Sequence, residues 1–313
     1  MKAIQISAYG GNEVLQINAD ASEPTLAPGQ VLVKVHAASL NPIDRVIRAG
    51  YLSALMPVTF PATLGGDFAG VVAKVGEAVV DLKAGDPVYG QAMLMNGGSG
   101  SLAQFVAANA ANTALKPRRV SYVEAAALPL AGVSAMQASE EHIRLEPGQR
   151  ILIHGGAGGV GAIAIQLAKY LGAYVATTVR ADDMDYVRGL GADQVIDYRS
   201  EAFEEKLTGF DAVLGTVGGE TIKRSFQVLR KGGILVSLLG QPDPELAGKY
   251  GVAAIEQYTA TNTRYLNRLA ELVDSGHIKV RVGKVFPLEQ ASAAFTHFDE
   301  GAPRGKVVVK MVD

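Results

Sequence analysis

A glycine-rich turn in the middle of the chain restricts the fold more than any other feature of the sequence. Residues 151–154, three apolar residues followed by His154, predict a short strand, and residues 162–171 have the spacing of a helix. Between them, Gly156, Gly158 and Gly161 form a G-x-G-x-x-G pattern. A strand, this pattern and a helix in that order predict a turn that binds the pyrophosphate of a dinucleotide. The residues expected to bind it are Gly155, Gly156, Ala157, Gly158, Gly159, Val160 and Gly161.

Each glycine of the pattern has an expected task. The first allows the tight turn, the second lets the backbone approach the phosphates, and the third lets the helix pack closely on the strand. The N-terminus of the helix offers free N–H groups and the positive end of its dipole to the phosphate charge. His154 directly precedes the turn, and we expect it to make a structural hydrogen bond rather than to act in catalysis.

The size and composition of the chain limit the classes of protein to which it can belong. With 313 residues it exceeds the size at which single cores usually split, so we expect two domains. The absence of cysteine excludes disulfides, thiolate nucleophiles, iron–sulfur clusters and cysteine-based zinc sites. The net charge of −2 and the scattered lysines and arginines give no electrostatic reason to expect nucleic acid or a membrane as a partner. We expect a soluble, cytoplasmic protein that acts on a small molecule.

The pattern of predicted elements changes twice along the chain. Residues 1–120 are rich in short strand-like runs separated by glycine and proline turns. Ser121 and Glu124 form a capping box that predicts a helix. Strand-like and helical runs then alternate, which favours a doubly wound parallel sheet, and strand-like runs return near the C-terminus. We predict an α/β protein in which residues 121–262 form a Rossmann domain and residues 1–120 and 263–313 together form a β-rich domain.

A series of motifs runs through nearly the whole chain. The motifs are SLNPID at 39–44, LGGDFAGVV at 64–72, VG at 75–76, KAGDPVYG at 83–90, GSLAQFV at 100–106, AAALPL at 125–130, the glycine turn, and GKVV at 305–308. Their kind and order resemble the medium-chain dehydrogenase/reductase superfamily. The chain is most similar to its zinc-independent quinone oxidoreductase-like branch, close to the alkenal/enone reductases. This resemblance implies that the β-rich domain is GroES-like.

The same resemblance implies a site without zinc. Zinc-dependent members carry Cys where Asn41 stands, Gly-His-Glu where residues 65–67 stand, and a lobe with four cysteines. Asp67 could donate an oxygen ligand, but neither Asn41 nor Gly66 offers the Cys or His that zinc requires. The five histidines show no i,i+4 spacing for a metal either. We therefore expect no metal.

Without zinc, the resemblance implies hydride transfer from NADPH to a quinone or an α,β-unsaturated ketone or aldehyde. Asn41 would hold the nicotinamide–ribose end of the cofactor, Tyr51 would line the acceptor pocket, and both are assigned to catalysis. Ser134 would lie near the nicotinamide. Two simpler interpretations stay open, because Asn-Pro commonly begins a turn and Tyr51 could serve packing alone. We expect the chemistry to occur where the glycine turn faces Asn41 and Tyr51.

The preference for NADPH over NADH depends on the end of the second strand of the Rossmann domain. NAD-dependent enzymes usually place an acid there, on the ribose 2′-hydroxyl, whereas this strand ends in Arg180. Thr178 and Arg180 are expected to bind a 2′-phosphate, and Tyr198 matches a tyrosine of the family near that phosphate. The following acids Asp182 and Asp183 weaken this prediction, and Arg180 could instead be a solvated loop charge. By the same resemblance, the cofactor site also includes Val217, Leu239, Gly240 and Lys306.

Two further expectations concern partners and the class of function. Residues 252–258 are mostly apolar and would form an edge of the parallel sheet, and such an edge invites pairing, so we expect a homodimer. An alternative function is a dinucleotide-binding protein without turnover, with a structural or RNA-interacting role. The sequence has no basic stripe with interleaved aromatic residues, which weighs against RNA. Cofactor-dependent reduction of a model quinone distinguishes the two functions.

Overall fold

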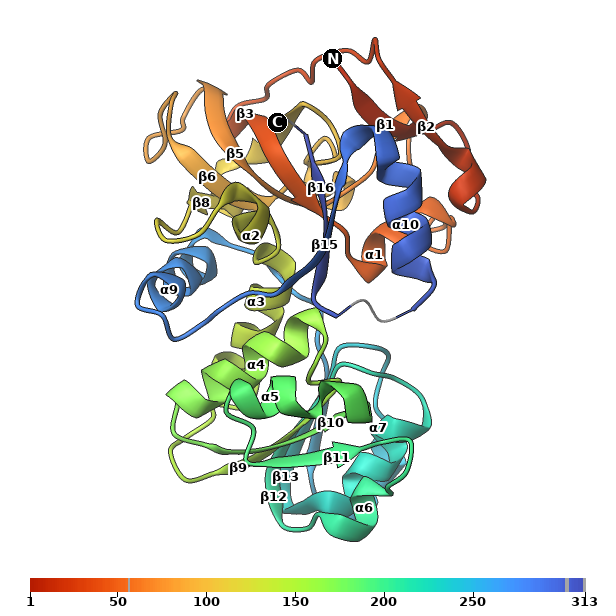
Figure 1. Ribbon diagram of the computed structural model, residues 1–313, viewed down its shortest axis with the longest axis vertical. Coiled ribbons are helices and arrows are strands. Elements are labelled where there is room, and N and C mark those ends of the chain that lie inside the picture. The colour runs from red at the N-terminus through yellow and green to blue at the C-terminus, as the bar shows by residue number, and fades with distance from the viewer. Residues whose placement is uncertain (56, 302–303, 312–313) are drawn as a thin grey trace. The chain divides into compact units, whose positions relative to one another are not determined.

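The computed structural model describes residues 1–55, 57–301 and 304–311 (Figure 1). Its contacts group the chain into two compact units. The β-rich unit comprises Met1–Leu130, Thr261–Gly276 and the segment from Val280 onward. The parallel-sheet unit comprises Ala131–Ala260 and His277–Lys279. The domain limits predicted from the sequence, at residues 120 and 262, stay a prediction.

The parallel-sheet unit is built on a six-stranded sheet. The strand order is β11-β10-β9-β12-β13-β14, and every neighbouring pair is parallel. The chain starts in the middle at β9, moves outward on one side, and then fills the other side from β12. This is the doubly wound Rossmann order, with its switch point between β9 and β12, so the predicted α/β class is confirmed. The strands are β9 (Arg150–His154), β10 (Tyr174–Val179), β11 (Gln194–Asp197), β12 (Phe210–Gly215), β13 (Leu229–Ser237) and β14 (Ala253–Glu256).

Apolar side chains explain why the central strands of this sheet are buried. Leu152, Val213 and Leu235, from three neighbouring strands, are fully buried in one core cluster with Phe210 and Phe226. Continuous apolar runs are typical of parallel strands that are covered on both faces. None of the helices in the described parts of the chain combines the length and the apolar character needed to cross a membrane. The helices from this part of the chain are α3 (Pro129–Met136), α4 (Gly159–Tyr170), α5 (Met184–Gly189), α6 (Phe203–Lys206), α7 (Glu220–Ser225) and α8 (Pro244–Tyr250), with a π-helix at Gln137–His142.

Two sheets form the β-rich unit. The larger has the order β15-β16-β3-β5-β6-β8, and the smaller has the order β2-β1-β4. β3 is long enough to pair with β7 along its first residues and with β16 along its last. Because β16 comes from the C-terminal part of the chain, both ends build this unit, as predicted. The strands are β1 (Ala3–Ile6), β2 (Leu15–Asn18), β3 (Gln30–Ser39), β4 (Ala62–Thr63), β5 (Asp67–Val75), β6 (Pro87–Gln91), β7 (Phe105–Asn109), β8 (Thr113–Leu115), β15 (Val282–Pro287) and β16 (Lys306–Lys310).

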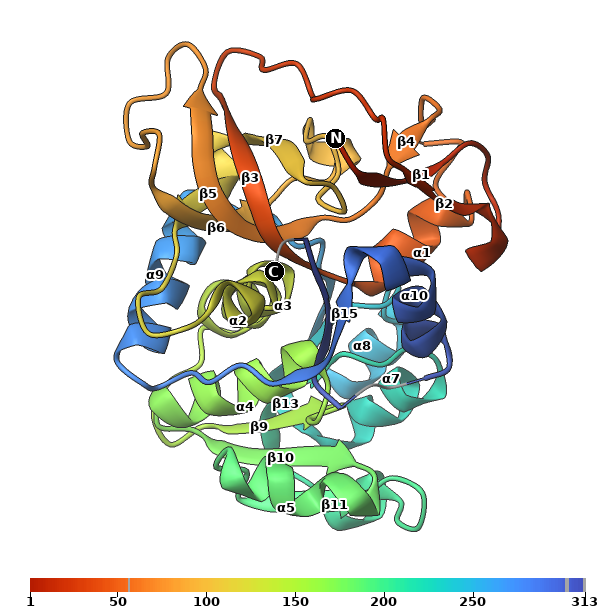
Figure 2. The ribbon, with the colours of Figure 1, turned by 45° about the horizontal axis from the view of Figure 1, so that its top comes forward.

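Helices cover parts of the β-rich unit. α10 packs against β15 (Figure 2) and also contacts β16. Its Phe295 is fully buried in the same core cluster as Phe68 of β5 and Val33 of β3. This cluster joins the N-terminal and C-terminal segments through buried apolar surface. The helices are α1 (Pro42–Arg48), α2 (Tyr122–Ala126), α9 (Thr263–Asp274) and α10 (Ala291–Asp299).

The capping box predicted at the start of α2 is confirmed. The Glu124 N–H donates to the Ser121 hydroxyl at 3.2 Å, and the Ser121 N–H donates to the Glu124 carboxylate at 2.8 Å. The predicted alanine-rich helix is nevertheless short, because α2 ends at Ala126 and a new helix begins at Pro129. Proline has no N–H to donate and disfavours helical geometry in the residue before it.

Candidate cofactor and active site

The glycine turn is held against β10 through its backbone. The N–H groups of Gly155 and Gly156 donate to the carbonyl of Thr178, at 3.1 and 3.3 Å. Gly155 has a φ of +69°, so the tight turn predicted at the first glycine of the pattern falls one residue earlier. Gly156 is required because a Cβ there would lie 2.2 Å from the Thr177 hydroxyl. Gly161 allows the expected close packing, since a Cβ there would lie 2.3 Å from the Gly155 carbonyl oxygen.

The outer face of the turn is open at the N-terminus of α4. Gly158 is the N-cap of this helix and is exposed, and a Cβ on it would meet, among the described residues, only the Gly155 carbonyl oxygen at 3.2 Å. The first helical hydrogen bond runs from Ala162 N–H to the Gly158 carbonyl, at 3.0 Å. The N–H groups of residues 159–161 therefore have no partner within the helix. Such free N–H groups, at the positive end of the helix dipole, fit a phosphate.

His154 ends β9 directly behind the turn and is fully buried. Its Nδ1 lies 2.9 Å from Thr178 Oγ1, and its Nε2 lies 2.9 Å from Ser225 Oγ. The Ser225 hydroxyl donates its own proton to the Thr221 carbonyl, so Nε2 carries the imidazole proton and Nδ1 accepts from Thr178. Burial, together with the charge of Arg224, lowers the pKa of His154 to about 3. The predicted structural hydrogen bond is confirmed, and a neutral imidazole links β9, β10 and α7.

The residues predicted to bind a 2′-phosphate have different surroundings. Thr178 is 4% exposed, and its hydroxyl proton is used in the bond to the imidazole. In this arrangement the proton is not available to a phosphate, and the role of Thr178 stays a prediction. Arg180 and Tyr198 directly follow β10 and β11, whose last residues are paired, and Tyr198 is 54% exposed. The Arg180 Nε lies 3.5 Å from Asp183 Oδ2, so one of the acids noted in the sequence is its neighbour.

The loops after β12 and β13 lie beside each other at the carboxyl edge of the sheet. The N–H of Leu238 donates to the carbonyl of Gly215 at 2.9 Å. In open α/β sheets, ligands bind in the crevice outside the carboxyl ends of the strands, at the switch point. The structure therefore brings the predicted residues Val217, Leu239 and Gly240 to the same edge of the sheet as the glycine turn.

Ser134 of α3 is buried and tied to the segment that follows β14. Its hydroxyl shares a hydrogen bond with Thr259 Oγ1 at 2.7 Å. Its carbonyl accepts from Gln257 Nε2 at 3.1 Å. The position predicted for Ser134, near the nicotinamide, stays a prediction.

In the β-rich unit, Asn41 begins helix α1. Its backbone N–H donates to the Asp44 carboxylate at 2.7 Å, and Pro42 follows at the first helical position, where its missing N–H costs nothing. Asn41 and Pro42 therefore mark the start of a helix, which agrees with the simpler interpretation of this pair as a backbone signal. The side chain has partners of its own. Its Oδ1 accepts from Lys306 Nζ, and its Nδ2 donates to Asp67 Oδ2 at 2.9 Å.

Asp67 and Lys306 belong to a buried polar cluster around Asn41. Asp67 also accepts from Gln91 Nε2 and from the Leu130 N–H, both at 3.2 Å. Burial raises the pKa of Asp67 and lowers that of Lys306, while their opposite charges oppose both shifts. The sequence prediction missed Gln91, because its place opposite Asp67 depends on the register between β5 and β6.

Asp44 is a second carboxyl that the sequence prediction left out of the site. It is 1% exposed, and burial raises its pKa to about 7 against the opposing effect of the Asn41 N–H. The signal for it was present, since Asp44 stands three residues after Asn41 at the start of a helix, the spacing of a capping box.

Zinc does not fit this cluster. Both ends of the Asn41 amide are engaged, and a zinc ion beside it would lie next to the Lys306 ammonium. Within residues 1–55, 57–301 and 304–311, no three His, Cys, Asp or Glu side chains group as a metal site. Zinc prefers Cys, His or carboxylate ligands, so the donor set supports the zinc-independent chemistry expected from the sequence.

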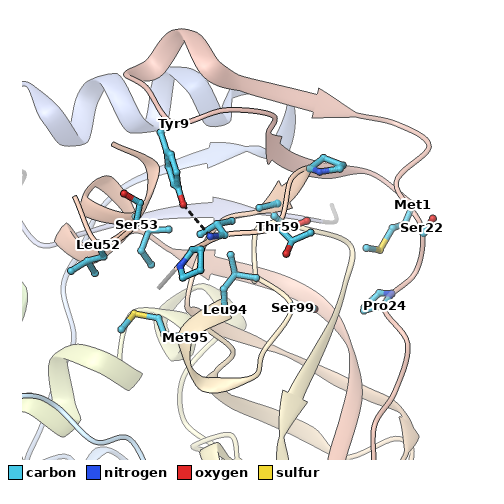
Figure 3. A pocket seen from close by; sticks show the side chains of 16 residues that line it. Met1, Tyr9, Ser22, Pro24, Leu52, Ser53, Thr59, Leu94, Met95 and Ser99 are labelled. Carbon is cyan, nitrogen blue, oxygen red and sulfur yellow. Dashed lines mark hydrogen bonds between the residues drawn. The ribbon is translucent and has the colours of Figure 1, made fainter. Parts of the chain in front are cut away.

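A pocket of about 550 Å³ lies beside the C-terminal part of α1 (Figure 3). Ile47 and Leu52 contribute apolar side chains, and the Tyr9 hydroxyl accepts from the Val58 N–H at 3.0 Å. Tyr51, which the sequence places beside the acceptor, is 80% exposed and is not among the described residues that line this pocket. Its predicted role stays a prediction.

Two family models match the chain. The model for zinc-binding dehydrogenases matches residues 190–309. The model for the alcohol dehydrogenase GroES-like domain matches residues 27–118, which confirms the GroES-like character predicted for the β-rich part of the chain.

Sequence relatives and solved structures match over nearly the whole chain. The chloroplastic NADPH-dependent alkenal/one oxidoreductase of Arabidopsis thaliana is 37% identical over 319 residues, covering 99% of this chain and 79% of the relative. The quinone oxidoreductase of Coxiella burnetii has a TM-score of 0.92 and 35% identity, covering 100% of this chain and 99% of that one. The Escherichia coli quinone oxidoreductase, solved in complex with NADPH, has a TM-score of 0.88 and 30% identity, covering 99% and 100%.

Proposed function

Because the chain belongs to the medium-chain dehydrogenase/reductase superfamily, in its quinone oxidoreductase and alkenal/enone reductase branch, we propose that it transfers a hydride from NADPH to a quinone or an α,β-unsaturated ketone or aldehyde. Membership makes it an NAD(P)H-dependent oxidoreductase. The observation that carries the proposal is the open glycine turn at the N-terminus of α4, on a sheet of Rossmann order. Its free N–H groups suit a pyrophosphate.

The carboxyl end of β10 supports NADPH as the cofactor. The strand is followed by Arg180, where NAD-dependent enzymes usually carry an acid. A guanidinium binds a phosphate through charge-assisted hydrogen bonds, and the exposed ring of Tyr198 follows the neighbouring strand. Asp183 competes for the same guanidinium. A bound 2′-phosphate must therefore share the Arg180 guanidinium with Asp183 or displace the Asp183 carboxylate from it.

The proposed chemistry suits an acceptor that is already electron-poor. When bound, the reduced nicotinamide supplies the hydride, and conjugation in the acceptor carries the negative charge to a carbonyl oxygen. Asn41 keeps one amide N–H after its bond to Asp67, and we assign this N–H to the nicotinamide–ribose end. Ser134 near the nicotinamide and Tyr51 beside the acceptor complete the proposed site.

Cofactor consumption with a panel of acceptors tests the proposal. We expect the purified protein to oxidise NADPH when a model quinone, an enone or an alkenal is added, and to bind NADPH more tightly than NADH. If NADPH binds but no acceptor is reduced, the enzymatic proposal fails, and a dinucleotide-binding protein with a structural or RNA-interacting role takes its place. Tighter binding of NADH contradicts the assignment of the cofactor.

We also propose that two copies of the chain form a homodimer along β14. This strand is the last of the six-stranded sheet, so within the described residues one of its edges has no neighbouring strand. An uncovered edge pairs readily with another strand, and a twofold arrangement satisfies both copies at once. Sedimentation at micromolar concentration should show a dimer, and a monomer contradicts the proposal. The cytoplasmic location stays a prediction.

A further inference from the structure

Lys306 is a buried lysine whose ammonium is directed into the Asn41 cluster. It is the first residue of β16 and is 7% exposed. Its Nζ donates to the Leu40 carbonyl at 2.9 Å and to Asn41 Oδ1. Lysines are almost never fully buried unless they are paired. Its placement therefore needs partners, and the structure supplies them from the segment that starts α1.

The amide of Asn41 is held between opposite charges. Its oxygen accepts from the Lys306 ammonium, and its nitrogen donates to the Asp67 carboxylate at 2.9 Å. A flipped amide would place an NH₂ group against the ammonium and an oxygen against the carboxylate, so both contacts would become repulsive. Asp67 is itself immobilised by Gln91 and by the Leu130 N–H. The orientation of the amide is thus determined by charge at both ends.

This orientation decides what Asn41 can offer to a ligand. An asparagine side chain has two N–H donors and an oxygen with two lone pairs. One N–H is used by Asp67 and one lone pair by Lys306. The second N–H is left, on a nitrogen that cannot exchange places with the oxygen.

Resting on the proposed function, we propose that Lys306 is a positioning residue for hydride transfer: it acts through Asn41, by keeping the second amide N–H toward the bound ligand, and does not itself touch the cofactor. The sequence had placed Lys306 among the residues that contact the cofactor. Two of its three ammonium hydrogens are used within the cluster, which supports the indirect role.

A spectroscopic experiment on the full chain tests the anchoring without any turnover. In protein labelled with ¹⁵N-asparagine, the side-chain NH₂ signals of Asn41 are assigned by their loss in Asn41→Asp. We expect these signals to shift and to exchange faster with solvent in Lys306→Met. Lys310→Met is the matched control, because Lys310 is an exposed lysine on the same strand, and it should leave the signals unchanged. Unchanged Asn41 signals in Lys306→Met overturn the proposal.

A second variant separates positioning from stability. Lys306→Met alone removes the nearby positive charge that offsets the burial of Asp67, and it is expected to lower the melting temperature. Lys306→Met combined with Asp67→Asn removes both charges, so the melting temperature should recover. We expect kcat to stay about 10²-fold below wild type in this double variant, the cost of a misplaced group, with the Kd for NADPH near the wild-type value. Recovery of kcat together with the melting temperature would mean a structural role alone.

Failure of this inference is distinguishable from failure of the proposed function. If the wild-type chain reduces no acceptor, the proposed function fails, while the Asn41 signals still report whether Lys306 holds the amide. If the wild type is active and the signals do not respond to Lys306→Met, only the positioning role fails.

Discussion

The buried imidazole of His154 should make the stability of this protein depend on pH in a definable way. Burial lowers its pKa to about 3 from the ordinary value of 6.5. Between these values the unfolded chain binds a proton that the folded chain does not bind. The free energy of unfolding therefore rises with pH across this window. The contribution of His154 is fully present above about pH 6.5 and is lost as the pH falls toward 3.

The size of this loss in stability is set by the pKa of the histidine in the unfolded chain. A pH of 5 lies about 1.5 units below 6.5, and each unit corresponds to about 1.4 kcal/mol, so His154 should remove about 2 kcal/mol of stability between pH 7.5 and pH 5. The result depends little on the folded pKa, since any folded pKa well below 5 leaves the imidazole neutral at that pH. Other groups titrate in the same range, and Asp44 acts in the opposite direction. The contribution of His154 must therefore be isolated by a variant.

The comparison uses His154→Gln, which keeps an amide near the same partners but does not titrate. Urea unfolding at pH 7.5 and pH 5 gives the free energy of unfolding, followed by far-ultraviolet circular dichroism because the chain has no tryptophan. The variant should lose about 2 kcal/mol less than the wild type on acidification. His142→Gln, at a half-buried position at the end of the π-helix, should behave like the wild type. Equal losses in wild type and His154→Gln would refute the reasoning.

Three further predictions concern the cofactor turn and the polar cluster. Gly158→Ala places a Cβ 3.2 Å from the Gly155 carbonyl oxygen, a tight contact that a shift of a few tenths of an ångström in the exposed turn relieves. The methyl group obstructs the pyrophosphate, so calorimetry should show the Kd for NADPH raised at least about tenfold, or about 1.4 kcal/mol; an unchanged Kd in a variant that folds, as checked by its circular dichroism, speaks against this site. Arg180→Ala should weaken NADPH about 10- to 100-fold, since a hydrogen bond to a charged group is worth about 1.5–3 kcal/mol, and should leave NADH binding near the wild-type value; equal losses for both cofactors would show that Arg180 does not recognise the 2′-phosphate. In the wild type, Asp44 has its pKa raised from 3.8 to about 7, so its contribution to stability is fully present below about pH 3.8 and is lost as the pH rises to about 7. The difference of about 3 pKa units corresponds to about 4 kcal/mol, so Asp44→Asn should gain about that much stability relative to the wild type over this window in urea unfolding, and a difference that stays constant with pH contradicts the assignment.

Local patterns predicted the parts of this protein that depend on neighbours in the sequence. The capping box of Ser121 and Glu124 forms as expected because its two hydrogen bonds span only three residues. The strand, glycine turn and helix around Gly158 were predictable for the same reason, since φ preferences and the helix N-terminus are local properties. The tight turn at Gly155 instead of Gly156 is a displacement of one residue within a correct element.

Contacts between distant segments could not be predicted in this way. The sequence showed no partner for the Thr178 hydroxyl, but the parallel pairing of β9 and β10 sets Thr178 beside His154, where the hydroxyl donates a hydrogen bond to the imidazole. Gln91 reaches Asp67 only because β5 and β6 pair in a particular register. A register between strands is set by the packing of whole faces, which no short motif encodes.

The sequence by itself determined the class of protein: a glycine turn between a strand and a helix, flanked by β-rich segments, in a chain with Asn41 where zinc-dependent relatives carry cysteine. The tertiary structure alone decided which side chains act together. Asn41 and Lys306 are separated by 265 positions along the chain, and only the pairing of β16 with β3 brings them into contact. Burial then restricts how the two side chains can pair, because a buried charge or amide group without a hydrogen-bond partner of opposite polarity costs free energy.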